Sequence, residues 1–255
     1  MLIKKFKKDN LEVQVFDSRQ AMGEGAAAEA VAYLKDILSK KDEIYMVFAA
    51  APSQNEFLEA VANADGIDWQ RVHALHMDEY VGLPADAPQG FSNFLKRAIF
   101  DKVPFASVDL IGTSSDSTAT IARYDAILAA HHVDVVFMGI GENGHIAFND
   151  PHVADFNDPK RIKKVDLDLK CRNQQVHDGC FVALDLVPEY ALTLTCPTLF
   201  NADRLFCVVP AATKADAVRT TVEGPISEAC PATVLRRHKA ATMYVDSDSG
   251  KYILD

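Results

Sequence analysis

Short apolar runs alternate with helix-like stretches along the whole chain. Ile44–Ala50 (IYMVFAA) and Val133–Met138 (VDVVFM) are apolar runs of the kind found in parallel strands that are buried on both faces. Leu11–Phe16 (LEVQVF) instead alternates apolar and polar residues, which is typical of an edge or half-buried strand. Further strands are predicted at Val72–His76, Ala191–Thr195, Leu205–Val209 and Ala241–Val245.

The predicted helices lie between these strands. Ser18 is placed to cap a long helix that ends near Leu38. Ser53 and Glu56 have the spacing of a capping box for a helix over Asn55–Asn63. Further helices are predicted at Phe91–Phe100, Thr118–Ala130 and Lys214–Val222. Strands separated by helices predict an α/β fold, with a mainly parallel sheet and helices on both of its faces.

A polar segment rich in Asp and Lys, from about Pro151 to Val187, interrupts the alternation. Two interpretations remain open for residues 151–187, namely a lid over a site or a solvated surface excursion. The chain has no fixed-period repeat and no low-complexity linker. We therefore predict a single domain over residues 1–255.

Charge and cysteine usage narrow the class of protein. The formal net charge is −10, with 26 Lys and Arg against 36 Asp and Glu. A broad nucleic-acid interface needs clustered positive charge, whereas a few local cations or a helix N-terminus can hold one anionic small molecule. None of the five cysteines forms a C-x-x-C pair, no apolar stretch of a signal peptide follows the lysines of MLIKKFKKDN, and no apolar run could span a bilayer. We expect a cytoplasmic protein with free thiols that binds neither nucleic acid nor membranes.

The first of three unusual segments is MDEYVGLP, residues 77–84, directly after a predicted strand. Ligands of open parallel sheets bind beyond the carboxyl ends of the strands, and here two adjacent carboxylates, Asp78 and Glu79, lie at such an end. A carboxylate in a partly dry cleft can act as a proton carrier because burial raises its pKa. The alternative is that these acids only cap the loop.

The second segment is GIGENGHIAFNDP, residues 139–151, which follows another predicted strand. Its glycines Gly139, Gly141 and Gly144 have the G-x-G-x-x-G spacing of a dinucleotide fingerprint. However, Pro151 and the loop-like FNDP leave no room for the long helix that would hold a pyrophosphate. We interpret the glycines as allowing a close approach of the backbone to a small ligand.

The same segment brings His145 close to Asn143 and Asp150. A carboxylate bonded to one ring nitrogen fixes the histidine tautomer and leaves the other nitrogen free for proton transfer. The segment therefore has the residues of a general acid or base, although a structural role for a loop histidine stays open.

The third segment is AAAPSQ, residues 49–54, at the end of the first strongly apolar strand. A helix N-terminus near Ser53 would offer free N–H groups to an anion. Lys214, at the start of a later helix, would add a positive charge. Ordinary capping and surface roles are the alternatives for both residues.

Together these segments resemble the glucosamine-6-phosphate deaminase/isomerase family. MDEYVGLP and the pattern G-I-G-x-N-G-H-I-A-F-N-x-P are specific to it, and VPEYALTL (residues 187–194) and the helix start at Lys214 are similar to family segments. The similar order of strands and helices extends over nearly the whole chain. The resemblance implies a modified Rossmann-like, three-layer α/β sandwich and an enzyme that uses no metal and no nicotinamide cofactor.

By this resemblance, Asp78 is the base that moves the C2 proton, His145 opens the sugar ring, and Asn143 and Asp150 support that histidine. The implied reaction opens a 2-amino-2-deoxy-hexose 6-phosphate such as glucosamine 6-phosphate, shifts a proton from C2 toward C1, and releases ammonia to leave a ketose phosphate. Family members occur as monomers and as homo-oligomers, and both states are open here. We expect substrate contacts from Ser53, Gln54, Glu79, Gly141, Gly144 and Lys214.

The chain also departs from the family pattern. Asn143 stands where many members have Asp, and Asp150 stands where Glu is usual. AAAPSQ replaces the Thr-Gly-Gly-Thr-Pro phosphate loop, and the lid arginine that binds phosphate has no clear match, with Gln174 and Gln175 near its place. The motifs therefore support the reaction type better than they support glucosamine 6-phosphate as the substrate.

Three other classes of function fit these residues less well. A 6-phosphogluconolactonase has the same fold, but Tyr80 after the acidic pair and AFNDP near His145 favour the deaminase motifs. A non-catalytic sugar-phosphate sensor would carry a basic helix-turn-helix segment, and none precedes the first predicted strand. A metal hydrolase is disfavoured because His73 and His76 lie three apart on one strand and so face opposite sides.

Overall fold

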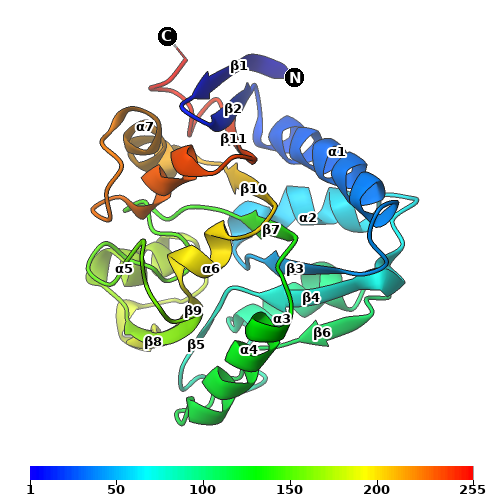
Figure 1. Ribbon diagram of the computed structural model, residues 1–255. Coiled ribbons are helices and arrows are strands. Elements are labelled where there is room, and N and C mark those ends of the chain that lie inside the picture. Colours follow the sequence, from blue (N-terminus) through cyan, green and yellow to red (C-terminus); the bar gives the residue numbers. More distant parts are fainter. Residues whose placement is uncertain (255) are drawn as a thin grey trace.

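The computed structural model describes residues 1–254 and has a central sheet of eight strands. The strands lie in the order β1-β2-β11-β10-β7-β3-β4-β6 (Figure 1). Neighbouring strands are parallel except β1 and β2, which are antiparallel. The strands span β1 Leu2–Lys8, β2 Leu11–Phe16, β3 Ile44–Phe48, β4 Val72–His76, β6 Ser107–Asp109, β7 Val135–Met138, β10 Arg204–Val209 and β11 Ala241–Asp246.

Helices cover both faces of this sheet (Figure 1). Successive side chains of a strand point to opposite faces, and accordingly Met46 and Phe48 of β3 pack into one hydrophobic cluster while Val47 packs into another. The first cluster contains residues of α1, α2 and α3, and the second contains residues of α4, α6 and α7. The predicted three-layer α/β arrangement is therefore confirmed. The helices span α1 Arg19–Leu38, α2 Asn55–Ala62, α3 Phe91–Leu95, α4 Thr118–Ala130, α5 Leu169–His177, α6 Cys196–Phe200 and α7 Ala215–Glu223.

A second, antiparallel sheet has three strands in the order β5-β9-β8. They span Asp78–Tyr80 (β5), Tyr190–Leu194 (β9) and Ile162–Asp166 (β8). The strand predicted at Ala191–Thr195 is thus confirmed as a strand, but it lies outside the parallel sheet. One residue separates β4 from β5, so the chain passes from the central sheet into the second sheet at Asp78.

The N-terminal strand was missed from the sequence. β1 pairs with β2 through LIKKFKK and forms the edge of the sheet, so β2 lies inside the sheet between β1 and β11. Of the two alternatives for Leu11–Phe16, an edge or a half-buried strand, the edge position was therefore wrong. Lysines on an edge strand oppose pairing with another sheet, and their abundance concealed the strand's apolar positions. No helix of residues 1–254 is long and apolar enough to cross a membrane.

The two predicted helix caps had different outcomes. Ser18 caps α1, since its side chain accepts a hydrogen bond from the Ala21 backbone N–H at 3.2 Å. The capping box at α2 was wrong, because a 3-10 turn over Pro52–Gln54 precedes that helix. Within that turn Ser53 accepts a hydrogen bond from the Gln54 side chain, and Glu56 forms an ion pair with Arg19.

The polar segment 151–187 is largely folded. It contains β8 and then α5, whose N-terminus is capped by Asp168 through a hydrogen bond from the Cys171 backbone N–H at 2.6 Å. Cys171, Gln174 and Gln175 of α5 are buried, so this part is not a solvated excursion. A lid role for the segment, like the single domain, stays a prediction. All five cysteines are free, and Cys180 alone among them is partly exposed.

Candidate active site

One cavity brings together the three segments singled out in the sequence. It lies at the carboxyl ends of β3, β4 and β7, where parallel sheets bind their ligands. Segment 49–54 forms one wall, and segments 77–84 and 139–151 contribute Asp78 and His145. The full lining is Ala49, Ala50, Ala51, Ser53, Gln54, Met77, Asp78, Phe91, Gly139, Ile140, Gly141, His145, Ala147, Phe148, Gln174, Gln175 and Lys214.

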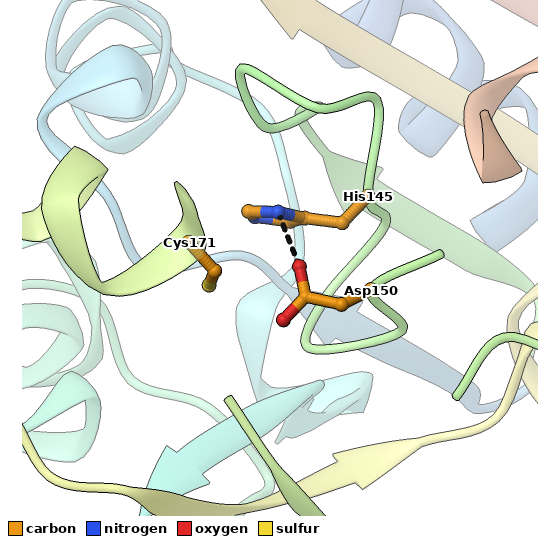
Figure 2. A group of neighbouring side chains, drawn as sticks. All are labelled: His145, Asp150 and Cys171. Atoms are coloured by element: carbon orange, nitrogen blue, oxygen red, sulfur yellow. Dashed lines mark ion pairs between the residues drawn. The ribbon is translucent and has the colours of Figure 1, made fainter. Parts of the chain in front are cut away.

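His145 is held by two neighbours on its Nδ1 side. This nitrogen lies 2.7 Å from Asn143 Oδ1 and 3.0 Å from Asp150 Oδ1, and Figure 2 shows the imidazole and the Asp150 carboxylate facing each other. The amide group of Asn143 donates to Asp150 at 2.9 Å and to Asp168 at 3.1 Å. Because that NH₂ faces two carboxylates, the amide oxygen must face His145.

This network decides the histidine tautomer. Both atoms facing Nδ1 of His145 are acceptors, so Nδ1 carries a proton and Nε2 is left free on the cavity side. Burial acts to raise the pKa of Asp150, but the attraction of His145 and hydrogen bonds from His145 and Asn143 hold that pKa below its usual value. Asn143 and Asp150 are therefore placed to orient His145 and do not line the cavity themselves.

Figure 2 also shows a third group beside this pair, the thiol of Cys171 on α5. One ligand atom from each of His145, Asp150 and Cys171 lies within 4.8 Å of the others. Histidine, aspartate and cysteine side chains are donor types of a zinc site. However, Nδ1 of His145 faces two hydrogen-bond acceptors, so it carries a proton and is not available to bind a metal. Burial, followed by the charges of Asp150 and Asp168, raises the pKa of the Cys171 thiol well above its usual value.

Gly141 and Gly144 of the second segment both need to be glycine, for different reasons. A Cβ on Gly141 would lie 2.1 Å from the imidazole ring, so only glycine lets the ring lie against the backbone. Gly144 has a φ of +78°, and a Cβ there would lie 2.3 Å from Cys230 Sγ. Gly144 does not line the cavity, and its assignment to substrate binding is corrected to a structural role. No helix directly follows these glycines, as Pro151 and the loop-like FNDP predicted.

Asp78 is a buried carboxyl group that faces the cavity. Its side-chain oxygens receive no hydrogen bond from residues 1–254, although its backbone oxygen accepts one from His76 Nδ1 at 2.9 Å. Burial, assisted by the nearby charge of Glu79, raises the pKa of Asp78 well above its usual value. A carboxyl group whose pKa is raised in this way is suited to take up and return a proton during a reaction.

Glu79 points away from the cavity, and its assignment to substrate binding was wrong. Its carboxylate accepts hydrogen bonds from the backbone N–H groups of Tyr80, Phe91 and Ser92 at 2.7–3.0 Å and from the Ser92 hydroxyl at 2.6 Å. Side chains alternate along a strand, so the two acids of β5 face opposite sides. Burial raises the pKa of Glu79 despite these hydrogen bonds. For this residue the loop-capping alternative is confirmed.

The histidines of β4 do face opposite sides, as their spacing predicted. His73 Nδ1 lies 2.8 Å from the Ser107 hydroxyl. His76 donates from Nδ1 to the Asp78 backbone oxygen and accepts from the Ile111 N–H at Nε2. Burial lowers the pKa of His76 to about 3, so it is a neutral structural link that holds the turn into β5.

Ser53, Gln54 and Lys214 line the cavity, and their contacts with a substrate stay a prediction. The Nζ atom of Lys214 is buried without a hydrogen-bond partner among the described residues, and burial lowers its pKa. Asp178 and Glu142 are the main nearby charges that oppose this shift. Gln54 donates to the Ser53 hydroxyl at 3.1 Å and to the Val208 backbone oxygen at 3.2 Å, and its own oxygen lacks a partner.

Several lining residues carried no signal in the sequence. Phe91 and Phe148 form an aromatic wall, stacked at 5.4 Å between ring centroids. Ala147 reaches the cavity with a φ of +50°, a conformation that costs free energy in a residue other than glycine. Gln174 and Gln175 were noted as departures from the phosphate-binding pattern, and the structure places both in the lining.

Comparison with known sequences identifies related proteins. Residues 17–244 match the family model described as glucosamine-6-phosphate isomerases/6-phosphogluconolactonase. Curated proteins named glucosamine-6-phosphate deaminase, from Bacillus thuringiensis (strain Al Hakam) and Bacillus cereus (strain AH820), are each 36% identical over 184 residues. That alignment covers 72% of this chain and 68% of each relative.

Comparison with solved structures supports the fold. A monomeric glucosamine-6-phosphate deaminase matches with a TM-score of 0.83 at 24% identity, covering 94% of this chain and 98% of the other. A 6-phosphogluconolactonase from Trypanosoma brucei matches with a TM-score of 0.77 at 15% identity, covering 97% and 99%. With the family model spanning most of its length and the strand-end motifs gathered in one cavity, the chain belongs to the glucosamine-6-phosphate isomerase/6-phosphogluconolactonase family.

Proposed function

We propose that this chain is a cofactor-independent isomerase and deaminase. Its substrate would be a 2-amino-2-deoxy-hexose 6-phosphate or a closely related amino sugar, and its products a ketose and ammonia. The observation that carries the proposal is one cavity that holds both Asp78, a carboxyl group with a raised pKa, and His145, an imidazole with a fixed tautomer. The curated relatives named glucosamine-6-phosphate deaminase support the same reaction.

In the first step the sugar ring opens. His145 takes the proton of the C1 hydroxyl at its free Nε2 and returns a proton to the ring oxygen as the C1–O5 bond breaks. Asn143 and Asp150 keep Nδ1 protonated throughout and stabilise the positive charge that the ring acquires for a moment. The open aldehyde makes the proton on C2 acidic enough for a carboxylate to remove.

In the second step Asp78 moves that proton. The ionised carboxylate takes the proton from C2 and delivers it to C1. A second proton passes from the amino nitrogen to O1, which leaves a hydroxyl at C1 and an imine at C2. Water adds to C2 and the C2–N bond breaks, so ammonia leaves and a ketose remains. The raised pKa of Asp78 makes the carboxylate a stronger base, and the absence of protein hydrogen bonds to it within the described residues leaves it free to reach both carbons.

Ammonia release from a panel of 2-amino-2-deoxy-hexoses, with and without a 6-phosphate, tests this proposal. Asp78→Asn and His145→Gln should each abolish most of the activity. Asp65→Asn, an exposed acid on a turn, serves as the control and should not change it. Silence of the folded wild-type protein toward every amino sugar would overturn the proposal. Hydrolysis of 6-phosphogluconolactone in the same experiment would then assign the chain to the lactonase side of its family.

A further inference from the structure

The cavity that contains Asp78 and His145 continues into a second one. The inner chamber has a volume of about 60 Å³, and an adjoining outer chamber has a volume of about 410 Å³. The two share four lining residues, Ala50, Ala51, Phe91 and Gln175. An engineered protein cavity that holds one benzene molecule measures about 150 Å³, so the inner chamber is too small to enclose a whole hexose. A sugar whose C1 and C2 lie at Asp78 therefore extends out of the inner chamber, and the shared residues lead from there into the outer one.

Gln175 is the polar side chain at this boundary. It is 6% exposed, and its amide makes no hydrogen bond with any other residue of the described chain. The amide lines both chambers, so water or a ligand there supplies the hydrogen bonds that the protein does not. Gln175 therefore presents an unused donor and an unused acceptor to whatever passes between the chambers.

The adjacent glutamine shows that this is not a general property of α5. The oxygen of Gln174 accepts a hydrogen bond from the Glu142 backbone N–H at 2.8 Å, and its nitrogen donates to Asp178 at 3.3 Å. Gln174 is thus used within the protein, whereas Gln175, equally buried, is not.

The charges around the boundary are poorly suited to a dianion. Lys214 is the one lysine or arginine in the inner lining, and Asp178 and Glu142 already act on it. Arg97 of the outer chamber is exposed and donates to the Pro88 backbone oxygen, and the carboxylate of Asp178 lines the same chamber. A phosphate monoester carries close to two negative charges at neutral pH, and an amide cannot neutralise either of them.

We propose that Gln175 is a specificity-determining residue that contacts the substrate end opposite to C1 and C2. The group it fits is an uncharged hydroxyl, which accepts and donates one hydrogen bond at the same time, and not a phosphate dianion. This inference rests on the proposed function and narrows it, because the favoured substrate becomes a 2-amino-2-deoxy-hexose whose C6 hydroxyl is free.

The test measures kcat/KM for paired sugars, glucosamine with glucosamine 6-phosphate and galactosamine with galactosamine 6-phosphate. The wild-type protein should prefer the free sugar. Gln175→Ala should lower kcat/KM for the free sugar about tenfold, mainly through KM. Gln175→Arg should shift the ratio toward the phosphorylated sugar by tenfold or more, since a charge-assisted hydrogen bond would replace a neutral one. Asn173→Ala, an exposed amide on the same helix, should leave the ratio unchanged.

Calorimetric binding of the same sugars to Asp78→Asn protein separates the two proposals. If the preference for binding the free sugar over its phosphate depends on Gln175 but the wild type turns over no sugar, the proposed reaction is wrong and the specificity assignment holds. If instead the wild type turns over amino sugars while Gln175→Ala and Gln175→Arg leave the ratio of kcat/KM for phosphorylated and free sugar unchanged, the assignment of Gln175 is overturned but the proposed reaction is not. A wild-type preference for the phosphorylated sugar would overturn the choice of a hydroxyl.

Discussion

The two ends of the cavity differ in how their polar groups are satisfied. At the reaction end, made of His145 with Asn143 and Asp150, the groups around Nδ1 all have partners within the protein. The other polar lining residues Gln54, Gln175 and Lys214, here called the distal end, are less satisfied. The Gln54 oxygen and the Lys214 ammonium group are buried without a protein partner within residues 1–254, and the Gln175 amide lines both chambers. The reaction end is organised before a substrate arrives, whereas the distal end needs the substrate to complete its hydrogen bonds.

Asp78, the proposed proton carrier of the reaction, should show the largest effect. Asp78→Asn should reduce kcat by roughly 10³-fold, because the amide cannot take a proton from carbon. The variant should also melt at a higher temperature than the wild type at neutral pH. Since the folded-state pKa of Asp78 is raised, the wild type loses stability as pH rises above the unfolded value of 3.8. Thermal melts at several pH values check this, and a gain that persists well below pH 4 would contradict it.

The contact that orients His145 can be removed by a substitution at a residue that does not line the cavity. Asp150→Asn should reduce kcat about 10²-fold with little change in KM, because Nδ1 of His145 loses its carboxylate partner. The pKa of Asp150 is lowered on folding, so its contribution to stability is present above pH 4 and lost as pH falls through the lowered value. The difference in unfolding free energy between wild type and variant should therefore shrink in acid, and a constant difference would argue against this pairing.

Changes at the distal end should affect KM more than kcat, the reverse of the result expected for Asp150→Asn. Lys214→Met should raise KM about tenfold while leaving kcat within a few fold, because the lost group binds but does not react. The variant should be more stable to denaturant than the wild type, since it removes a buried ammonium group that burial disfavours. Equilibrium unfolding in urea checks the second part. A large fall in kcat would place Lys214 at the reaction end instead.

Glu79 should give the smallest effect on activity, although it is the immediate neighbour of Asp78. Glu79→Gln should change kcat/KM less than about threefold, and it should lower the unfolding free energy by about 1–3 kcal/mol, because the amide group faces N–H donors at the start of α3. Parallel kinetics and urea unfolding test both parts. A loss of activity approaching that of Asp78→Asn would mean that the two acids act together in the cavity.

Most of the buried strands, and the loop around His145, could be predicted from the residues alone. Apolar runs such as Ile44–Ala50 located the buried strands because parallel strands covered on both faces have to be apolar throughout. The loop around His145 could also be predicted, because G-x-N-G-H with its nearby Asp fixes short-range contacts among neighbouring residues. Short-range hydrogen bonds depend on spacing along the chain, and spacing can be read directly.

Contacts between segments that are distant in the sequence became visible only in the folded chain. The sequence could not show which of Asp78 and Glu79 faces the cavity, because that depends on how β5 pairs with β9 and on where α3 begins. It could not separate Gln174 from Gln175, because the partners that use Gln174 come from the Glu142 loop and from the end of α5. Two adjacent residues of one chemical type acquire different roles when only one of them finds its hydrogen bonds within the fold.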